Sequence, residues 1–256
     1  VMHEIVSPDI HVDVCIIEPT EERNYYTLVT LGAGAHRMTL PEDVDAQQWG
    51  RAEFVICLPP DWDIQSADET WYWPIRCLKS TARLAGNEDS WLGPWHTVSN
   101  AGGHYADNTD LTGLILLWPQ NAPEEANTCV LPGGDEVNFY QIFPLYEEEI
   151  QYKLEYGSEA LIESMAEVDH VLNIHRPNAQ AGFVRPNQKT FLLKREDILP
   201  MLTDWEGPEG CLATDRITVD GAPVGYMYRE EPDGDYPDSG WRFTAGDESD
   251  EYMKSQ

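Results

Sequence analysis

The segment HTVSNAGGH carries the first residues that could do chemistry: His96, Ser99 and His104. Two histidines can bind a metal ion, and a serine beside a histidine can act as the nucleophile of a hydrolase. A metal site needs three or four converging ligands, and no third ligand has a suitable spacing. The GxSxG frame of a nucleophilic serine is also missing. We therefore expect structural or surface histidines here, and no catalytic residues, metal or cofactor.

Two other segments match ligand-binding loops only in part. GAGAHR at 32–37 follows an expected strand, as a dinucleotide-binding loop would, but Arg37 stands where the third glycine belongs. Asp233, Asp235 and Asp238 begin a calcium-loop spacing that Pro237 interrupts. We expect a plain glycine turn in the first case. In the second we expect a solvated turn, with weak cation binding as the alternative.

Hydrophobic periodicity predicts the elements that position these loops. Helical spacing of apolar residues begins at Pro74, and Gly157 separates two further expected helices. Alternating or β-branched runs indicate strands at residues 11–17, 25–31, 53–58, 114–118 and 137–143, the last ended by Pro144. The mixture predicts an α+β protein with a mixed sheet and helices packed on it.

Changes in composition divide the chain into three parts. Residues 1–175 hold most of the expected elements and form the first domain. Residues 176–205 begin with a polar, basic and proline-containing stretch, which is typical of a linker or crossing segment. Residues 206–256 form a second, smaller α+β domain. There Asp220-Gly221 predicts a hairpin between strands at 211–219 and 224–229.

The charge of the chain excludes several classes of partner. The 256 residues contain 16 Lys and Arg against 46 Asp and Glu, a formal net charge of −30. A phosphate backbone or an anionic membrane surface would be repelled by this charge. Hydrophobic residues make up 41% of the chain, enough for a core, yet no run of 18 apolar residues predicts a membrane-spanning helix. The charge favours either plain solvation or a protein partner with a basic surface.

The cysteines point to a reducing compartment. Five is an odd number, no two cysteines have a CxxC spacing, and most lie in apolar runs such as VICL. The N-terminal stretch shows no basic segment followed by an apolar one, so no signal peptide is expected in the chain as given. We expect a cytoplasmic location.

The first domain resembles the bacterial members of the suppressor of fused family. The resemblance covers about the first 175 residues and depends on the order of its segments rather than on a catalytic signature. The segments are HVDVCIIEPTEERNYYTLVTLGAGAHRMTLPE at 11–42, RAEFVICLPPDW at 51–62, WLGPWH at 91–96 and VNFYQIFPLYEEEIQYKLEYGSEALIESM at 137–165.

The second domain resembles a small bacterial domain grouped with the immunity proteins of polymorphic toxin systems. CLATDRITVDGAPVGYMYREEP at 211–232 and DSGWRFTAGDESDEYM at 238–253 carry this resemblance. It implies that the second domain is incomplete at the C-terminal end of this sequence.

Together the two resemblances imply a non-enzymatic immunity protein that neutralises a bacterial toxin by binding it. The animal relatives capture an extended peptide by strand addition, which any exposed sheet edge permits. One alternative is a regulatory scaffold for an endogenous protein. Another is a hydrolase or ligand-binding enzyme with an unrecognised site.

Two segments are the candidate protein contacts. The first is the loop with Trp91, Trp95 and His96, since large aromatic side chains bury much surface at low entropy cost. The second is the turn with Asp238, Ser239, Trp241 and Arg242. For this turn a purely structural role is the alternative, in which the Asp and Ser oxygens order the backbone.

Overall fold

The computed structural model describes residues 1–2, 11–87, 90–101, 103–120, 122–166, 168–186, 189, 191–193, 210–232, 238–249 and 252–253. The chain divides into two compact units, Val1–Pro186 and Asn187–Gln256, called here unit 1 and unit 2. Asp233 and Asp235 of the expected acidic turn lie outside the described residues.

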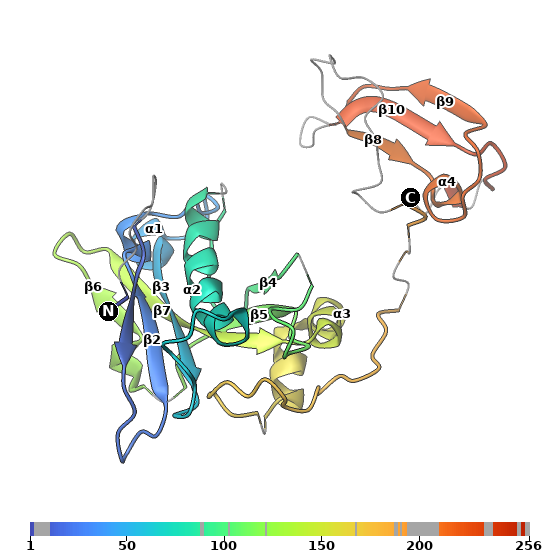
Figure 1. Cartoon of the computed structure of the whole chain (residues 1–256). Coiled ribbons are helices and arrows are strands. Elements are labelled where there is room, and N and C mark those ends of the chain that lie inside the picture. The colour runs from blue at the N-terminus through green and yellow to red at the C-terminus, as the bar shows by residue number, and fades with distance from the viewer. Residues whose placement is uncertain are drawn as a thin grey trace. The chain divides into compact units, whose positions relative to one another are not determined.

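Unit 1 is built on a seven-stranded mixed sheet (Figure 1). The strand order is β1-β2-β3-β7-β5-β4, and β6 pairs with β7 beside this path. β3 and β7 are parallel, and the other pairs are antiparallel. The strands are β1 (Asp13–Ile17), β2 (Tyr26–Leu31), β3 (Arg51–Leu58), β4 (Thr97–Ser99), β5 (Gly113–Leu117), β6 (Thr128–Val130) and β7 (Glu136–Leu145).

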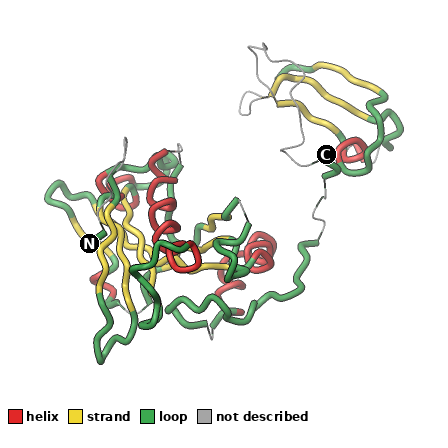
Figure 2. Tube along the Cα trace, in the orientation of Figure 1, coloured by secondary structure: helices red, strands yellow, loops and turns green. Residues whose placement is uncertain are grey.

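Helices pack on this sheet, as the sequence predicted (Figure 2). They are α1 (Ala46–Trp49), α2 (Glu69–Asn87) and α3 (Glu147–Ser164), with short 3-10 turns at Ala33–Ala35 and Glu124–Ala126. Gly157 has φ +89° inside α3 and breaks it into two helical segments, which confirms the expected break. No helix in the described ranges is long and apolar enough to span a bilayer.

Apolar side chains fill both faces of the sheet. The larger core joins α2 to alternate residues of the strands, among them Leu28, Phe54, Trp73 and Tyr140. A smaller core joins α3 to the opposite face of β5 and β7 through Ile115, Phe143, Ile150 and Leu161. The fold is therefore an α+β layered arrangement, as expected.

Helix α2 begins earlier than predicted, at Glu69 rather than at Pro74. Asp68 caps it, because its carboxylate accepts from the backbone N–H of Thr70 at 2.9 Å. Pro74 has no N–H to offer the Thr70 carbonyl one turn earlier. The side-chain amide of Asn108 donates to that carbonyl at 3.1 Å instead. A contact from a distant loop thus makes the proline tolerable inside the helix.

Strand β7 continues through Pro144, where an end was predicted. Pro144 pairs with Leu114 of β5, but its carbonyl accepts from Arg176 Nη2 at 3.0 Å. The missing N–H lies on the same side as that carbonyl, away from β5. The proline therefore removes no hydrogen bond from the pairing with β5.

Unit 2 is a three-stranded sheet of order β8-β10-β9, with one turn of helix, α4 (Asp215–Thr218). Its strands are β8 (Gly210–Ala213), β9 (Tyr226–Arg229) and β10 (Asp238–Thr244). The predicted hairpin is wrong: β8 lies parallel to β10, and β9 pairs with β10 rather than with β8. Gly221 does have the positive φ of a tight turn, +74°, but that turn follows α4.

Candidate protein-binding surfaces

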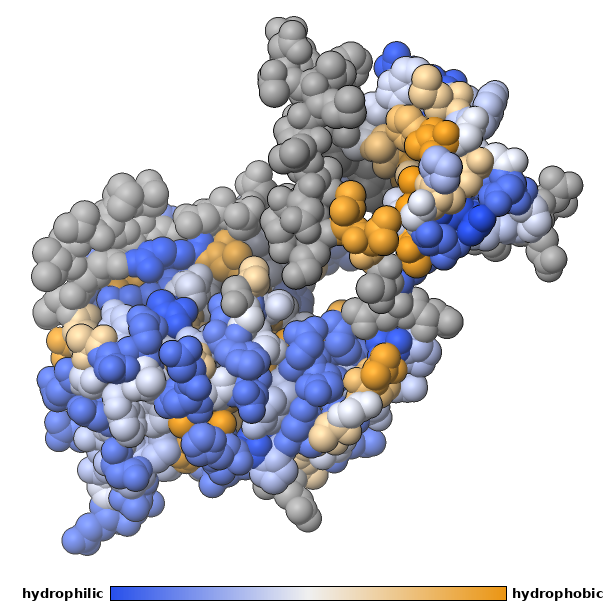
Figure 3. Space-filling view, turned by 45° about the vertical axis from the view of Figure 1, so that its right-hand side comes forward, coloured by the Kyte–Doolittle hydropathy of each residue, from blue (hydrophilic) through white to orange (hydrophobic). Residues whose placement is uncertain are grey.

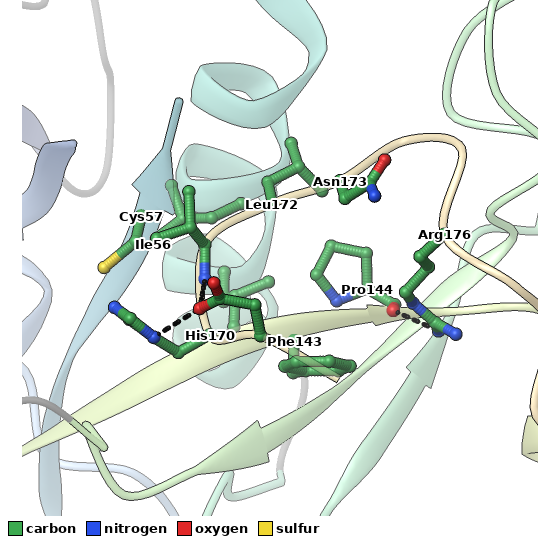
Figure 4. A pocket seen from close by; sticks show the side chains of 11 residues that line it. Ile56, Cys57, Phe143, Pro144, His170, Leu172, Asn173 and Arg176 are labelled. Atoms are coloured by element: carbon green, nitrogen blue, oxygen red, sulfur yellow. Dashed lines mark hydrogen bonds and ion pairs between the residues drawn. The ribbon is translucent and has the colours of Figure 1, made fainter. Parts of the chain in front are cut away.

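One small cavity in unit 1 brings a cysteine, a histidine and a carboxylate near one another (Figure 4). His170 Nδ1 lies 2.6 Å from the Asp169 carboxylate, and Cys57 lines the same cavity. Burial raises the pKa of the Cys57 thiol to about 11, so the reactive thiolate is scarce at neutral pH. The cavity volume of about 10 Å³ suits one water molecule rather than a substrate. This grouping does not support nucleophilic catalysis.

The described contacts of His96 and His104 are with other residues of unit 1 and give these histidines a structural role. His96 Nδ1 accepts from the backbone N–H of Gly93 at 3.3 Å, and burial lowers the pKa of His96 below its usual range. His104 Nδ1 lies 3.8 Å from the Asp110 carboxylate. The described part of the chain contains no group of three or more His, Cys, Asp or Glu side chains that could hold a metal ion.

The loop 91–96 is held against strand β5 by its backbone. The Trp95 N–H donates to the Leu116 carbonyl at 2.7 Å, and the Leu116 N–H donates to the His96 carbonyl at 2.9 Å. The Trp91 ring stands edge-on to His96 at 4.6 Å and covers Gly93, where a Cβ atom would lie 2.6 Å from the ring. Trp91 is half-buried and packs on the main core.

Trp95 presents its side chain outward from this fixed loop. Its side chain is 43% exposed, and its φ of +72° is the one left-handed value among the described non-glycine residues. An aromatic residue adopts this conformation only where the surroundings impose it. The hydrogen bonds to Leu116 supply that constraint, so the exposed ring is carried on a rigid backbone.

The turn predicted at 238–242 is wrong, because these residues form part of strand β10, and their side-chain contacts lie mostly within unit 2. Both Asp238 oxygens accept from Arg242, at 2.8 and 2.7 Å, and the Gly240 N–H donates to Asp238 at 2.9 Å. Arg242 also donates to Glu230 at 2.6 Å. Asp238, Ser239 and Arg242 are buried, while Trp241 is half-exposed. Trp241 stacks with Arg229, whose guanidinium lies 5.8 Å from the ring centre.

The glycine turn at 32–37 binds a carboxylate that sequence reasoning missed. Glu53 of β3 is buried and accepts from the Gly32 and Gly34 N–H groups at 2.9 and 3.0 Å, and from the Thr30 hydroxyl at 2.6 Å. Burial raises the pKa of Glu53. The available signal was a charged residue inside the otherwise apolar strand EFVICL. The turn is an anion nest filled by the chain itself, not a phosphate site.

In the part of unit 1 that the structure describes, β1, β4 and β6 each pair with a single strand and so lie at sheet edges. Part of β1 is covered, because Val14 exchanges backbone hydrogen bonds of 2.8 and 3.1 Å with Met2. β4 begins two residues after Trp95 and pairs with β5 through residues 97–99. An edge strand offers backbone donors and acceptors to an extended segment. The exposed Trp95 ring and the β4 edge are therefore neighbours along the chain.

Comparisons with known proteins match the two units to two different families. Residues 8–177 match the family described as suppressor of fused protein (SUFU). Residues 211–256 match the immunity protein Imm33 domain. An uncharacterised protein of Ureaplasma parvum is 27% identical over 159 residues, which cover 62% of this chain and 74% of that protein.

Solved structures resemble this chain at low sequence identity. A protein described as a SUFU homologue from Neisseria gonorrhoeae superposes with a TM-score of 0.51 at 17% identity, over 70% of this chain and 85% of that chain. Drosophila Suppressor of Fused gives a TM-score of 0.47 at 14% identity, over 67% of this chain and 43% of that chain. The first of these likenesses supports the α+β assignment.

Proposed function

This chain belongs to the suppressor of fused family, and from that membership we propose that it is an immunity protein that neutralises a bacterial toxin by direct binding. The observation that carries the proposal is the presence of a SUFU domain and an Imm33 immunity domain in one chain. Both families are binding modules without catalytic residues to transfer.

The charge of the chain indicates what kind of toxin surface it fits. A net charge of −30 attracts a basic partner and speeds its encounter, and it penalises acidic partners. Toxins that act on nucleic acids have basic active sites shaped for phosphates. A basic toxin domain is therefore the partner that this chain would bind fastest.

The interaction would take place in the cytoplasm. All five cysteines are unpaired, and two of them, Cys129 and Cys211, are exposed. Exposed unpaired thiols persist in reducing compartments and are oxidised elsewhere.

Two aromatic side chains are the proposed anchors. Trp95 stands on a rigid loop beside the β4 edge, and Trp241 lies on the central strand of unit 2. Trp91 and His96 would support the first anchor. Asp238, Ser239 and Arg242 would support the second. Strand addition at β4 is the proposed mode for the first contact.

The test is capture followed by rescue. The full chain would serve as bait in its native organism at low and at high salt, and each captured protein would then be expressed alone and with the chain. We expect one basic domain that is retained at low salt and partly lost at high salt, and that stops growth unless the chain is present. Capture of only non-toxic proteins, or toxicity that the chain fails to relieve, would contradict the proposal.

A variant pair tests the first anchor in the same assay. Trp95→Ala should weaken retention at least tenfold, on the order of the loss for an interface hot spot. Trp71→Ala is the matched control, because Trp71 has a similar exposure but lies on α2 rather than in the loop before β4.

A further inference from the structure

Residues 176–186 contact α3 along one side, although the sequence predicted that they form a connecting segment. This stretch, named here the strap, belongs to unit 1 and runs alongside the first helical segment of α3. Its contacts reach α3 at residues 148, 149, 152, 155 and 156, which lie on one side of a helix. Unit 1 ends where the strap ends, at Pro186.

The first part of the strap is a firm anchor. Arg176 and Glu149 form a buried ion pair, with nitrogen to oxygen distances of 2.6 and 2.5 Å. The Ala179 N–H donates to the same carboxylate at 3.0 Å, and Asn178 donates to Glu148 at 2.9 Å. Separating a buried pair leaves an uncompensated charge, so this end stays in place while unit 1 is folded.

The second part of the strap, residues 180–186, is a lightly held arm. The Phe183 ring meets Tyr152 and Tyr156 edge-on, with ring centres 5.2 and 5.8 Å away. Arg185 Nε lies 3.0 Å from the Glu155 carboxylate, and both side chains are about one third exposed. Val184, between them, is 78% exposed. Exposed ion pairs and single aromatic contacts contribute little each, so the arm can open without unfolding α3.

We infer that Tyr152, Glu155 and Tyr156 form a recognition face for an extended protein segment, and that the arm occupies this face in the free chain. The segment that fits carries an aromatic residue followed two positions later by an arginine, as Phe183 and Arg185 do. The two tyrosines hold the aromatic ring, and Glu155 fixes the arginine. A partner with such a segment competes with the arm, and the anchor keeps the displaced arm close by.

This inference rests on the proposed function in one respect only, namely that the partner is a basic protein. The recognition face is defined by contacts within the chain, so it can be tested with the chain's own segment. It can therefore fail while the immunity role stands, and it can hold if the partner proves not to be a toxin.

The experiment uses a capped synthetic peptide of residues 180–186, QAGFVRP, titrated into the isotope-labelled full chain. The amide NMR signals of residues 152–156 report binding. The double variant Phe183→Ala/Arg185→Ala releases the arm and leaves the Arg176–Glu149 anchor untouched. We expect the peptide to bind the double variant roughly tenfold or more tightly than the unmodified chain, because the face is then no longer occupied.

Matched variants show whether the side chains named here carry the binding. Adding Glu155→Gln to the double variant should weaken peptide binding several-fold, whereas adding Glu159→Gln, beyond the Gly157 break, should leave it unchanged. A peptide with alanine at the Phe183 position should not shift the α3 signals. Equal binding to the open variant and the unmodified chain, or no shift in the open variant, would overturn the inference.

Discussion

The two units place their apolar and polar side chains in opposite ways. Unit 1 buries Leu28, Phe54, Trp73 and Tyr140 almost completely between its sheet and helices. In the described part of unit 2 no apolar side chain is buried. The buried side chains there are polar, namely Thr214, Asp238, Ser239, Arg242 and Thr244.

Unit 2 is held by charged hydrogen bonds where unit 1 is held by packing. Arg242 links β10 to Glu230, and Glu248 accepts from the Thr214 hydroxyl and from the Ala245 and Gly246 N–H groups. Apolar side chains reach the surface of unit 2 in Figure 3. Those that are at least half exposed are Phe191, Leu192, Leu193, Leu212, Val224, Tyr226 and Met227.

Unit 1 thus has an apolar core of its own, whereas the described part of unit 2 exposes its large apolar side chains. Unit 1 buries apolar area in its own core, and this burial drives folding. Unit 2 leaves apolar area in contact with water, which costs free energy unless something covers it. The immunity-type unit thus has more to gain from binding a protein than the suppressor of fused unit has.

The largest effect that distinguishes the units is expected from a core leucine. Leu28→Ala removes a fully buried side chain of unit 1 and should lower the free energy of unfolding by about 2–5 kcal/mol. Denaturant unfolding followed at amides of β2 and β3 would measure this loss. A loss below about 1 kcal/mol would mean that packing does not hold unit 1 as described.

The second effect is expected from the polar interior of unit 2. Arg242→Ala leaves the buried Asp238 carboxylate without its main partner and removes the link to Glu230. Amide hydrogen exchange in β8, β9 and β10 should become roughly tenfold faster or more, with unit 1 unchanged. Arg216→Ala is the control, because its partners Asp220 and Asp247 are exposed. Equal effects of the two variants would contradict a polar interior.

Much of unit 1 could be predicted because its signals are local. β3 is a β-branched and apolar run between breakers, and Gly157 interrupts a helical pattern at the place where the helix breaks. The start of α2 could not be predicted, since Pro74 is tolerated through a hydrogen bond from Asn108, far along the chain. A long-range contact overrides a local rule there.

The candidate surfaces show the same limit. The sequence correctly placed Trp91 and Trp95 in a loop, wrongly placed Asp238 in a turn rather than in β10, and did not show which of these side chains reach water. Exposure of Trp95 depends on hydrogen bonds to Leu116, and burial of Asp238 depends on Arg242. Asp220-Gly221 correctly indicated a turn, but this turn lies between α4 and β9 and does not join two paired strands.

A third prediction compares how the stability of each unit changes at low pH. The Thr214 hydroxyl, foremost, lowers the pKa of Glu248 from 4.5 to about 2. A lowered pKa in the folded state gives stability that is present above 4.5 and is lost as the pH falls toward 2. In unit 1 the signs are mixed, because burial raises the pKa of Glu53, whereas hydrogen bonds from Arg37 and Arg51 lower the pKa of Asp135.

Hydrogen exchange or NMR between pH 5 and pH 2 would follow both units in one sample. As the pH is lowered, we expect unit 2 to lose its protection before unit 1 does. Glu248→Gln should weaken unit 2 at neutral pH and flatten its pH dependence. Loss of both units at one pH in the unmodified chain would count against separate stabilisation.

The smallest effect on stability is expected from a leucine in unit 2. Its substitution is the counterpart of Leu28→Ala in unit 1. Leu212 of β8 is 62% exposed, so Leu212→Ala should change the free energy of unfolding by no more than about 0.5 kcal/mol. The same variant removes apolar area that a partner would cover, so its effect should appear in complex formation rather than in folding. A leucine that matters for binding and not for stability would place the interaction surface on unit 2. A destabilisation as large as that of Leu28→Ala would instead show that unit 2 has an apolar core, and the contrast between the two units would then disappear.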